Sequence, residues 1–348
     1  MASLSQLKFA MATSIFLSAF IFGLLVFAIV YFLELDAFTG LVIALGGSAL
    51  FILFQYAIGP AIVAATTRLH YVKPGESPWL EATVKELADK SGLPMPKLAI
   101  VPNNTPNAFT FGRTTSNATL AVHEGLLKNL NEAEVKGVIA HELGHIKHKD
   151  YIVMTVLSAL PLIAYMVAQG ALSAGMFSGY SGRRNKDNSG IILLAIGAIS
   201  FAVYILTFLI VMRLSRLREH YADAYSAYVT GSPRELESAL AKITYGLSIS
   251  PKPPEGARAF YIEDPAMAKQ EVQHIMEKKD EYDLDRDGVL DERELELAME
   301  KEAKSTWAQM NSLFSTHPPT FKRILLLKEI ANEMDSGKYS NDKVYAHV

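Results

Sequence analysis

The sequence predicts an α-helical integral membrane protein with four transmembrane helices and a mainly α-helical soluble part that contains a small β-sheet. Three observations carry this prediction. Four long stretches contain no charged residue, 50% of the 348 residues are hydrophobic, and a few short strand signals stand among the helix signals outside those stretches. The mean hydropathy of +0.18 is also high for a soluble protein.

The four charge-free stretches span residues 9–33, 37–67, 151–182 and 188–212. The first has 25 residues, and a helix of that length exceeds a hydrocarbon core about 30 Å thick, at about 1.5 Å of rise per residue. Four buried helices of a soluble protein are the alternative, but runs of this length without a charge favour lipid. A proline inside the second stretch, Pro60, predicts a kink or an early helix end there.

Lysine and arginine residues near the ends of the stretches predict the orientation in the membrane. One side collects eight of them and the other side three, in the "GRRNKD" segment of the loop 176–189. The eight are Lys8, Arg68, Lys73, Lys147, Lys149, Arg213, Arg216 and Arg218. This bias predicts a multi-pass protein of the plasma membrane, with both termini and both soluble parts in the cytoplasm.

Residues 68–150 carry helix and strand signals in turn. "SPWLEATVKELADKSG" predicts a helix, since Ser77 can cap its start, Pro78 suits its first turn and Gly92 follows its end. "KLAIV" and "ATLAV" predict short strands, and "PNAFTFG" predicts a strand or an extended loop. "NEAEVKGVIAHELGHIKH" predicts a second helix, with Asn131 as its cap.

The stretch "VIAHELGHIKHKDY" predicts a metal site. His141 and His145 are four residues apart, so a helix places both imidazoles on one face, where they can bind one metal ion. Glu142 lies beside them and can contact a metal-bound water. A pair of surface histidines near the membrane is the alternative, but the apolar flanks favour the metal site. The chain has no cysteine, so zinc must be bound by histidine and carboxylate.

The segment "SRLREHYADAYSAYVTG" offers carboxylates for a third ligand. Glu219 and Asp223 are four residues apart on a predicted helix just beyond the fourth stretch. By spacing alone, this pair is better explained as a solvated helix face with local ion pairs.

Four motifs together resemble the HtpX-type membrane zinc metallopeptidases, relatives of the CAAX prenyl proteases. They are "PNAFTFG", "VIAHELGHIKHKD", "SRLREHYADA" and "LFSTHPPTFKRI", and the resemblance covers residues 1–262 and 312–330. It implies that the soluble part is a zinc metallopeptidase domain and that Glu219 is the third zinc ligand. It also implies that Asp223 accepts the free N–H of His141 and so orients that ligand.

The same resemblance gives roles to four more residues. His317 and Arg323 are expected near the zinc, where they would stabilise the oxyanion that forms on the substrate carbonyl. The alternative for His317 is that it only caps the helix that follows Pro318 and Pro319. Asn107 and Phe109 are expected on an edge strand beside the scissile bond, where an extended peptide can add by backbone hydrogen bonds.

These residues predict a zinc-dependent endopeptidase that hydrolyses membrane or misfolded proteins at the cytoplasmic membrane surface, with Glu142 as general base. The expected partners are protein or peptide substrates and the lipid bilayer. A net charge of −3 gives no reason to expect nucleic acid, and no feature predicts an oligomeric state. Two alternatives are a non-enzymatic calcium-binding membrane module with a vestigial zinc site, and a CAAX-type prenyl protease. CAAX-type prenyl proteases have more than four transmembrane spans, which argues against the second alternative.

An acidic segment departs from the family pattern. Residues 263–304 carry fifteen Asp and Glu against seven Lys and Arg. Within them, "DLDRDGVLDERE" matches the twelve-residue loop of an EF-hand, between two helical flanks. The predicted Ca²⁺ ligands are Asp283, Asp285, Asp287, the Val289 carbonyl, Asp291 and Glu294. An acidic solvated loop is the alternative. If calcium binds, we expect it to order this segment and so to position His317 and Arg323.

The predicted organisation has six parts. They are transmembrane helices 1 and 2 (1–67), a cytosolic metallopeptidase part with the histidine helix (68–150), transmembrane helices 3 and 4 (151–212), cytosolic helices with the third zinc ligand (213–262), the EF-hand-like insert (263–304) and the C-terminal part of the metallopeptidase domain (305–348).

Overall fold

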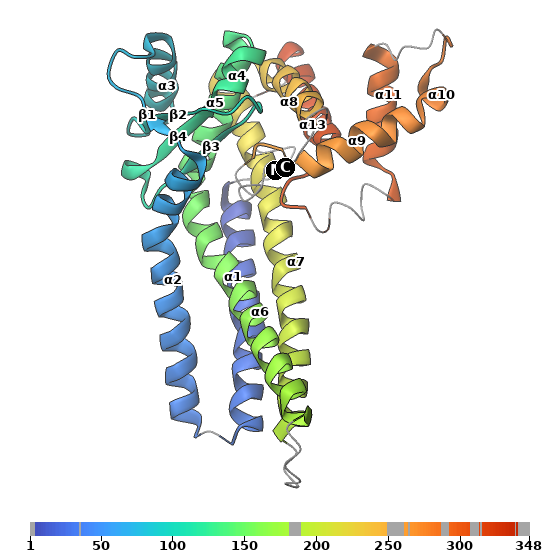
Figure 1. Ribbon diagram of the computed structural model, residues 1–348. Coiled ribbons are helices and arrows are strands. Elements are labelled where there is room, and N and C mark those ends of the chain that lie inside the picture. The colour runs from blue at the N-terminus through green and yellow to red at the C-terminus, as the bar shows by residue number, and fades with distance from the viewer. Residues whose placement is uncertain are drawn as a thin grey trace. The chain divides into compact units, whose positions relative to one another are not determined.

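The computed structural model of the protein is mostly helical, with one small sheet (Figure 1). It describes residues 4–34, 36–180, 189–248, 261–263, 265–286, 292–306, 313, 315–337 and 339. The chain divides into two compact units. One unit holds residues 8–59 and 152–214, and the other holds residues 1–7, 60–151 and 215–348.

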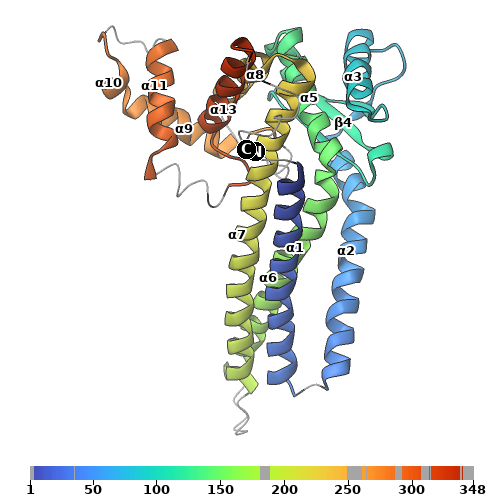
Figure 2. The same cartoon turned by 180° about the vertical axis from the view of Figure 1, so that it is seen from behind.

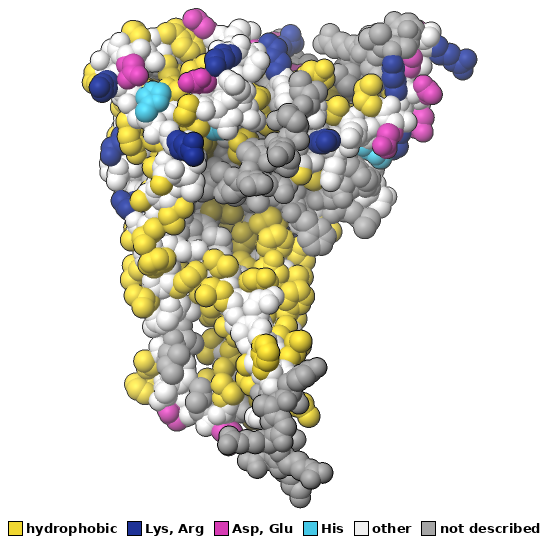
Figure 3. Space-filling view, in the orientation of Figure 1, with side chains coloured by type: hydrophobic (Ala, Val, Ile, Leu, Met, Phe, Trp, Pro, Cys, Tyr) yellow, Lys and Arg dark blue, Asp and Glu magenta, His cyan; other side chains and the backbone are white. Residues whose placement is uncertain are grey.

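The first of these units is built from long apolar helices. These are α1 (Leu4–Phe32), α2 (Ala37–Thr67), α6 (Asp150–Tyr180) and α7 (Ser189–Thr230). All four are long and apolar enough to cross a membrane. Phe16, Phe27 and Ile191 are among their exposed side chains, and Figure 3 shows hydrophobic side chains over their surface. The prediction of four transmembrane helices is confirmed.

Helix α2 has the bounds of the predicted stretch 37–67, but Pro60 lies inside it, so the predicted early end does not occur. Helix α7 continues without a break to Thr230, so the predicted helix with Glu219 is continuous with the fourth charge-free stretch. This extension carries the polar segment with Glu219 and Asp223 into the second unit.

The second unit contains a four-stranded sheet. Its strands are β1 (His70–Tyr71), β2 (Lys97–Val101), β3 (Ala108–Phe111) and β4 (Thr119–His123), in the order β1-β2-β4-β3. Strands β2 and β4 are parallel, and the other pairs are antiparallel. The "PNAFTFG" segment therefore forms a strand, and that strand lies at one edge of the described sheet.

The register of β3 decides on which face of the sheet each of its side chains lies. Phe109 pairs with Ala121 and Thr110 pairs with Leu120. Because side chains alternate along a strand, Phe109 and Phe111 pack with the small hydrophobic cluster around Val63. Ala108 packs on the opposite face, in the main core, and Thr110 shares that face.

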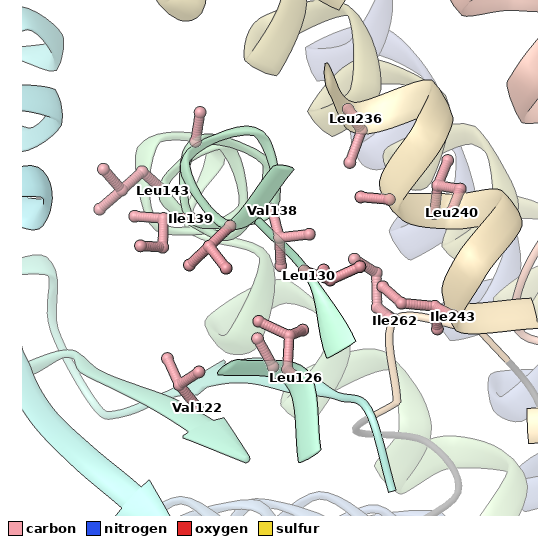
Figure 4. Packing of buried hydrophobic residues seen from close by; sticks show 14 of the residues in the cluster. Val122, Leu126, Leu130, Val138, Ile139, Leu143, Leu236, Leu240, Ile243 and Ile262 are labelled. Carbon is pink, nitrogen blue, oxygen red and sulfur yellow. The ribbon is translucent and has the colours of Figure 1, made fainter. Parts of the chain in front are cut away.

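Helices complete this unit and form its main core. They are α3 (Pro78–Ser91), α4 (Glu124–Asn129), α5 (Glu132–His148), α8 (Pro233–Ser248), α9 (Pro265–Glu277), α10 (Lys279–Tyr282), α11 (Glu292–Ala303) and α13 (Thr320–Asp335), with a short 3₁₀ turn at Thr115–Asn117. Figure 4 shows Val138 of α5 on the side of Leu236 and Leu240 of α8, and Ile139 and Leu143 on the other side of α5, all within the same core. This packing holds α5, the helix with the two predicted histidine ligands, in place from its apolar face.

The ends of α3 and α5 follow their predicted caps in most respects. Asn131 accepts from the Glu134 backbone N–H, and the Glu134 carboxylate accepts from the Asn131 N–H, which is a capping box. Gly92 ends α3 in the left-handed conformation. Ser77 is the N-cap of α3 but makes no side-chain capping bond; the Glu81 carboxylate accepts from its backbone N–H instead.

Candidate metal centre

Helices α5 and α7 bring three potential metal ligands together. His141 and His145 are one turn apart on α5, and Glu219 lies on α7. The two Nε2 atoms are 3.1 Å apart. His141 Nε2 lies 3.4 Å from Glu219 Oε2, and His145 Nε2 lies 3.4 Å from Glu219 Oε1. The structure thus brings the three predicted ligands into one cluster.

The spacing and the donor types of this cluster fit a zinc ion. Tetrahedral zinc binds nitrogen and oxygen at about 2.0–2.1 Å, which separates neighbouring ligand atoms by about 3.3 Å. The observed separations of 3.1 and 3.4 Å agree with this value. Two imidazoles and one carboxylate are also a typical ligand set of catalytic zinc, in which water takes the fourth position.

Each histidine is oriented by a carboxylate on its other nitrogen. His141 Nδ1 lies 2.9 Å from Asp223 Oδ1, as the family resemblance implies. His145 Nδ1 lies 2.6 Å from Asp150 Oδ2. A carboxylate at Nδ1 holds the proton there and leaves Nε2 free to bind a metal. Both imidazoles are therefore held in the tautomer that the site needs.

Asp150 is a functional residue that the sequence analysis missed. Helix α5 ends at His148, and Lys149 takes the left-handed conformation with φ of 60°. This sharp change of direction lets Asp150, the first residue of α6, reach back to His145. A signal for it was its place five residues after His145, at the start of an apolar stretch that otherwise has no charge.

Two buried arginines hold these carboxylates. Arg218 forms an ion pair with Asp150. Arg323 binds Asp223 through two bonds, Nε to Oδ2 at 2.9 Å and Nη2 to Oδ1 at 2.7 Å. Bidentate pairs of this kind are strong and fix the carboxylate plane. Burial alone lowers the pKa of Arg323, but the charge and hydrogen bonds of Asp223, together with the charges of Glu219 and Glu263, outweigh burial and raise it.

The charges around His141 favour a cation. Burial by itself lowers the pKa of His141, but hydrogen bonds to Asp223 and Glu219 outweigh it and raise the pKa to about 9. The pKa of His145 is raised as well, since the charge of Glu219 opposes the effect of burial. A divalent metal ion benefits from the same negative surroundings and competes with these protons.

Glu142 lies next to the cluster and is only 3% exposed. Burial raises its pKa, while the charges of His145 and His141 oppose that effect. The side chain of Thr110 on β3 forms a hydrogen bond with this carboxylate. A buried carboxylate with a raised pKa is suited to accept a proton near neutral pH. Thr110 had no role in the sequence analysis, although it lies within the quoted "PNAFTFG" motif.

The structure also brings His317 and Arg323 to the cluster. His317 Nε2 lies 3.8 Å from Glu219 Oε1, and Arg323 Nη2 lies 3.6 Å from Glu219 Oε2. Pro319, not His317, is the N-cap of α13, so the capping alternative for His317 is wrong. Arg323 is fully buried, and its other donors bind Asp223 and the Ile262 carbonyl. This arrangement favours a positioning role for Arg323 over a direct contact with substrate.

Asn107 and Phe109 belong to the segment of β3, and both side chains are buried. The Asn107 Oδ1 atom accepts from the backbone N–H of Ile262 at 2.9 Å. The Phe109 ring packs against Phe111 and His123. A contact of this segment with substrate therefore stays a prediction, and it concerns the strand backbone. The Asn107 side chain instead holds Ile262, whose carbonyl also binds Arg323.

A second cluster of carboxylates lies between α10 and α11. One oxygen each of Asp283, Asp285 and Glu294 lies within 4.8 Å of the other two. Glu294 Oε1 accepts from the backbone N–H of Leu284 at 2.5 Å. The other predicted calcium ligands, Asp287, Val289 and Asp291, lie outside the described residues, as does most of the loop 176–189.

Comparison with known proteins identifies the family. The family model of peptidase family M48 matches residues 74–331. A "Protease HtpX homolog" of Aeropyrum pernix is 36% identical over 318 residues, covering 86% of this chain and 91% of that protein. Another, from Thermococcus sibiricus, is 36% identical over 321 residues, covering 91% of this chain and 95% of that protein.

A solved structure is also similar to this chain. The crystal structure of S. mikatae Ste24p matches with a TM-score of 0.48 and 16% sequence identity, over 94% of this chain and 66% of that chain. The family match and the identity to the two relatives show that the chain belongs to peptidase family M48, as an HtpX-type membrane metallopeptidase.

Proposed function

We propose that this protein is a zinc-dependent endopeptidase that cuts membrane proteins and misfolded chains at the cytoplasmic surface of the plasma membrane, in protein quality control. The observation that carries the proposal is the convergence of His141, His145 and Glu219 next to a buried glutamate. Family membership supports peptide-bond hydrolysis. Family membership and the presence of Glu142 beside the cluster favour an active enzyme over a membrane module with a vestigial site, because such a module has no need of a general base.

In this proposal, His141, His145 and Glu219 hold the zinc. When bound, the zinc polarises the substrate carbonyl and lowers the pKa of a water molecule toward neutrality. Glu142 accepts the proton of that water and then donates it to the leaving amine. His317 donates a hydrogen bond to the oxyanion. Arg323 and Asp223 keep His141 in place.

Substrate binds in this proposal along β3. An extended peptide can add to an edge strand by backbone hydrogen bonds, and β3 lies at an edge of the described sheet. Thr110 of β3 contacts Glu142, so a peptide on this strand passes close to the general base. Backbone recognition of this kind accepts many sequences, which suits an enzyme that removes diverse misfolded proteins.

A membrane-surface location is supported by the apolar helices α6 and α7, which carry Asp150 and Glu219. Glu219 lies seven residues after Met212 on the unbroken helix α7, which is about 10 Å at 1.5 Å per residue. Asp150, which orients His145, is the first residue of the apolar helix α6. Substrates anchored in the bilayer therefore reach the site within a short length of chain. The lysine and arginine bias supports the cytoplasmic side.

The orientation has a direct test, because the chain has no cysteine. We expect Ser116→Cys, on an exposed turn of the unit that contains the sheet, to react with a membrane-impermeant thiol reagent only after the membrane has been permeabilised. Glu34→Cys, between α1 and α2, should react from outside intact cells. The reverse pattern would place the catalytic unit on the other side.

The enzymatic proposal is tested with Glu142→Gln. We expect this variant to keep one equivalent of zinc and to lose at least about a hundredfold in kcat on a model membrane substrate, as removal of a general base does. Glu132→Gln is the matched control, because Glu132 is exposed on the first turn of the same helix. Turnover by zinc-replete Glu142→Gln at the wild-type rate contradicts the mechanism.

We also propose that residues 283–294 bind Ca²⁺ through Asp283, Asp285, Asp287, the Val289 carbonyl, Asp291 and Glu294. The ligand spacing supports this, and so does the convergence of three of the carboxylates. Terbium luminescence sensitised by Tyr282, directly before the loop, measures the binding. We expect calcium to displace terbium, and Asp283→Asn with Glu294→Gln to abolish the signal. An unchanged signal in that double variant contradicts the site.

A further inference from the structure

Helix α13 has an unusual start for a helix that supports an active site. It carries Arg323 in its first turn, and His317 lies shortly before it. Its N-cap is Pro319, which provides no side-chain acceptor for the free backbone N–H groups of the first turn. The start of the helix therefore depends on acceptors from other elements.

The acceptor comes from the acidic insert. Glu271 on α9 is 3% exposed, and its two carboxylate oxygens accept from the backbone N–H of Thr320 at 3.3 and 3.1 Å. Thr320 is the first residue of α13. A carboxylate at this place caps the helix and interacts favourably with its dipole. Thr244 of α8 holds the Thr320 hydroxyl at 3.1 Å, so α13 begins at a fixed point.

The segment just before α9 holds Arg323 itself. The backbone carbonyl of Ile262 accepts from Arg323 Nη1 at 2.5 Å, and Glu263 Oε2 lies 3.5 Å from the same nitrogen. Burial and the charge of Glu271 raise the pKa of Glu263 well above its usual range. The guanidinium therefore lies between Asp223 on one side and Ile262 and Glu263, just before α9, on the other.

The two helices that flank the calcium loop are joined by a buried carboxylate. Glu302 of α11 is 1% exposed. It accepts from Tyr282 Oη at 2.5 Å and from Lys278 Nζ at 2.7 Å, and it lies 3.0 Å from His274 Nε2 on α9. Met299 of α11 also belongs to the same hydrophobic core as residues of α13. Figures 1 and 2 show α9, α11 and α13 as neighbouring helices.

We propose that Glu271 is a positioning residue for Arg323 and His317, and that it makes catalysis responsive to calcium bound at residues 283–294. This inference rests on the calcium site and the catalytic roles proposed above. In this proposal, calcium fixes Glu294, in the first turn of α11, beside Asp283 and Asp285, which already lie close to it. The contacts of Glu302 then keep α9 and α10 in place against α11, and Glu271 keeps the start of α13 in place. The insert thus acts as a support of the active site.

The test compares the wild type with Glu271→Gln in the full-length, zinc-loaded protein. The readouts are kcat and KM on a model membrane substrate with and without calcium, zinc content, and terbium binding. For the wild type we expect calcium to raise kcat about threefold to tenfold with little change in KM. Glu271→Gln should bind zinc and terbium normally, lose about tenfold in kcat and show no calcium activation, while KM stays within twofold.

Two further variants keep the test decisive. Glu277→Gln on the same helix removes an exposed carboxylate and should behave as the wild type. Glu271→Asp keeps the charge and should recover part of kcat. If Glu271→Gln does not fold, Glu302→Gln replaces it, and we expect this variant to bind terbium but to lose calcium activation.

The outcomes separate the inference from the proposals beneath it. Calcium binding without any change in kcat, together with normal kcat in Glu271→Gln, overturns the inference. If the wild type binds no terbium but Glu271→Gln still lowers kcat, the proposed calcium site is wrong and the positioning role of Glu271 is supported. A wild-type protein that holds zinc but cuts no substrate defeats the proposed function first.

Discussion

The carboxylate of Asp150 is expected to set the zinc affinity of this protein, and Asp150→Asn tests that expectation. The side chain lies 2.6 Å from His145 Nδ1 and forms an ion pair with buried Arg218. Asparagine keeps the size of the group but removes its charge. The variant therefore weakens the support of one zinc ligand and leaves a buried guanidinium without its anion.

The two consequences differ in size and in the quantity that they change. Loss of a carboxylate partner of a metal-bound histidine typically weakens metal binding about 10- to 100-fold, which is about 1.4–2.7 kcal/mol. Leaving Arg218 unpaired costs about 3–5 kcal/mol of the free energy of unfolding, as for other buried pairs with one partner removed. Arg218 and Asp150 are 2% and 7% exposed, so solvent screens little of this cost.

A double variant separates these effects. In Asp150→Asn with Arg218→Met, the buried charge is gone, so we expect most of the lost stability to return, while the zinc affinity stays low. The assay is competition for zinc with a chelator of known affinity, beside thermal unfolding of the zinc-saturated protein. Asp89→Asn, an exposed site on α3, is the control. A folded Asp150→Asn variant whose zinc Kd stays within twofold of the wild-type value contradicts the role of Asp150 in zinc binding.

Three other predictions concern the same network. Arg323→Lys replaces the bidentate pair with Asp223 by a single point charge, so we expect kcat/KM to fall about 10- to 100-fold with zinc retained. Asn107→Ala leaves the buried N–H of Ile262 without its acceptor and should lower the free energy of unfolding by about 1–3 kcal/mol. In protein freed of zinc by a chelator, protonated His141, whose pKa is raised to about 9, stabilises the fold. This contribution is complete below pH 6.5 and is lost as the pH rises through about 9. The free energy of unfolding should fall by about 3 kcal/mol across that window.

Each of these predictions can be contradicted by a stated result. Arg234→Lys changes an exposed arginine and should leave kcat/KM unchanged; wild-type kinetics in Arg323→Lys contradict the role of the bidentate pair. Chemical denaturation measures the effect of Asn107→Ala, and no loss of stability contradicts the hydrogen bond to Ile262. The zinc-loaded protein is the control for the pH series, since metal replaces the proton on His141, and a flat series in the chelated protein contradicts the raised pKa.

Local patterns in the sequence predict much of this site. The i, i+4 spacing of His141 and His145, the capping box that begins at Asn131, and the long charge-free stretches are all properties of one helix at a time. Each depends on neighbours within a few residues, so each is visible before the chain folds. Glu219 and Asp223 needed the family resemblance, because their spacing alone is better explained by a solvated helix face.

The rest of the site depends on contacts between distant segments. Arg323 and Asp223 are 100 residues apart, and Ile262 and Asn107 are 155 residues apart. Their pairing follows from how α13 and the 261–263 segment pack on the unit, which no local pattern encodes. Asp150 is closer in sequence, but its role depends on the left-handed residue Lys149, a conformation that a lysine rarely adopts.

In the proposed site, two imidazoles and one carboxylate bind a single catalytic zinc. Zinc K-edge X-ray absorption of the purified protein measures this ligand set. We expect one zinc per chain, with scattering from two imidazole rings and the remaining ligands being oxygen, all at about 2.0–2.2 Å. A chain that takes up no stoichiometric zinc, or a bound zinc whose spectrum shows fewer than two imidazoles, contradicts it.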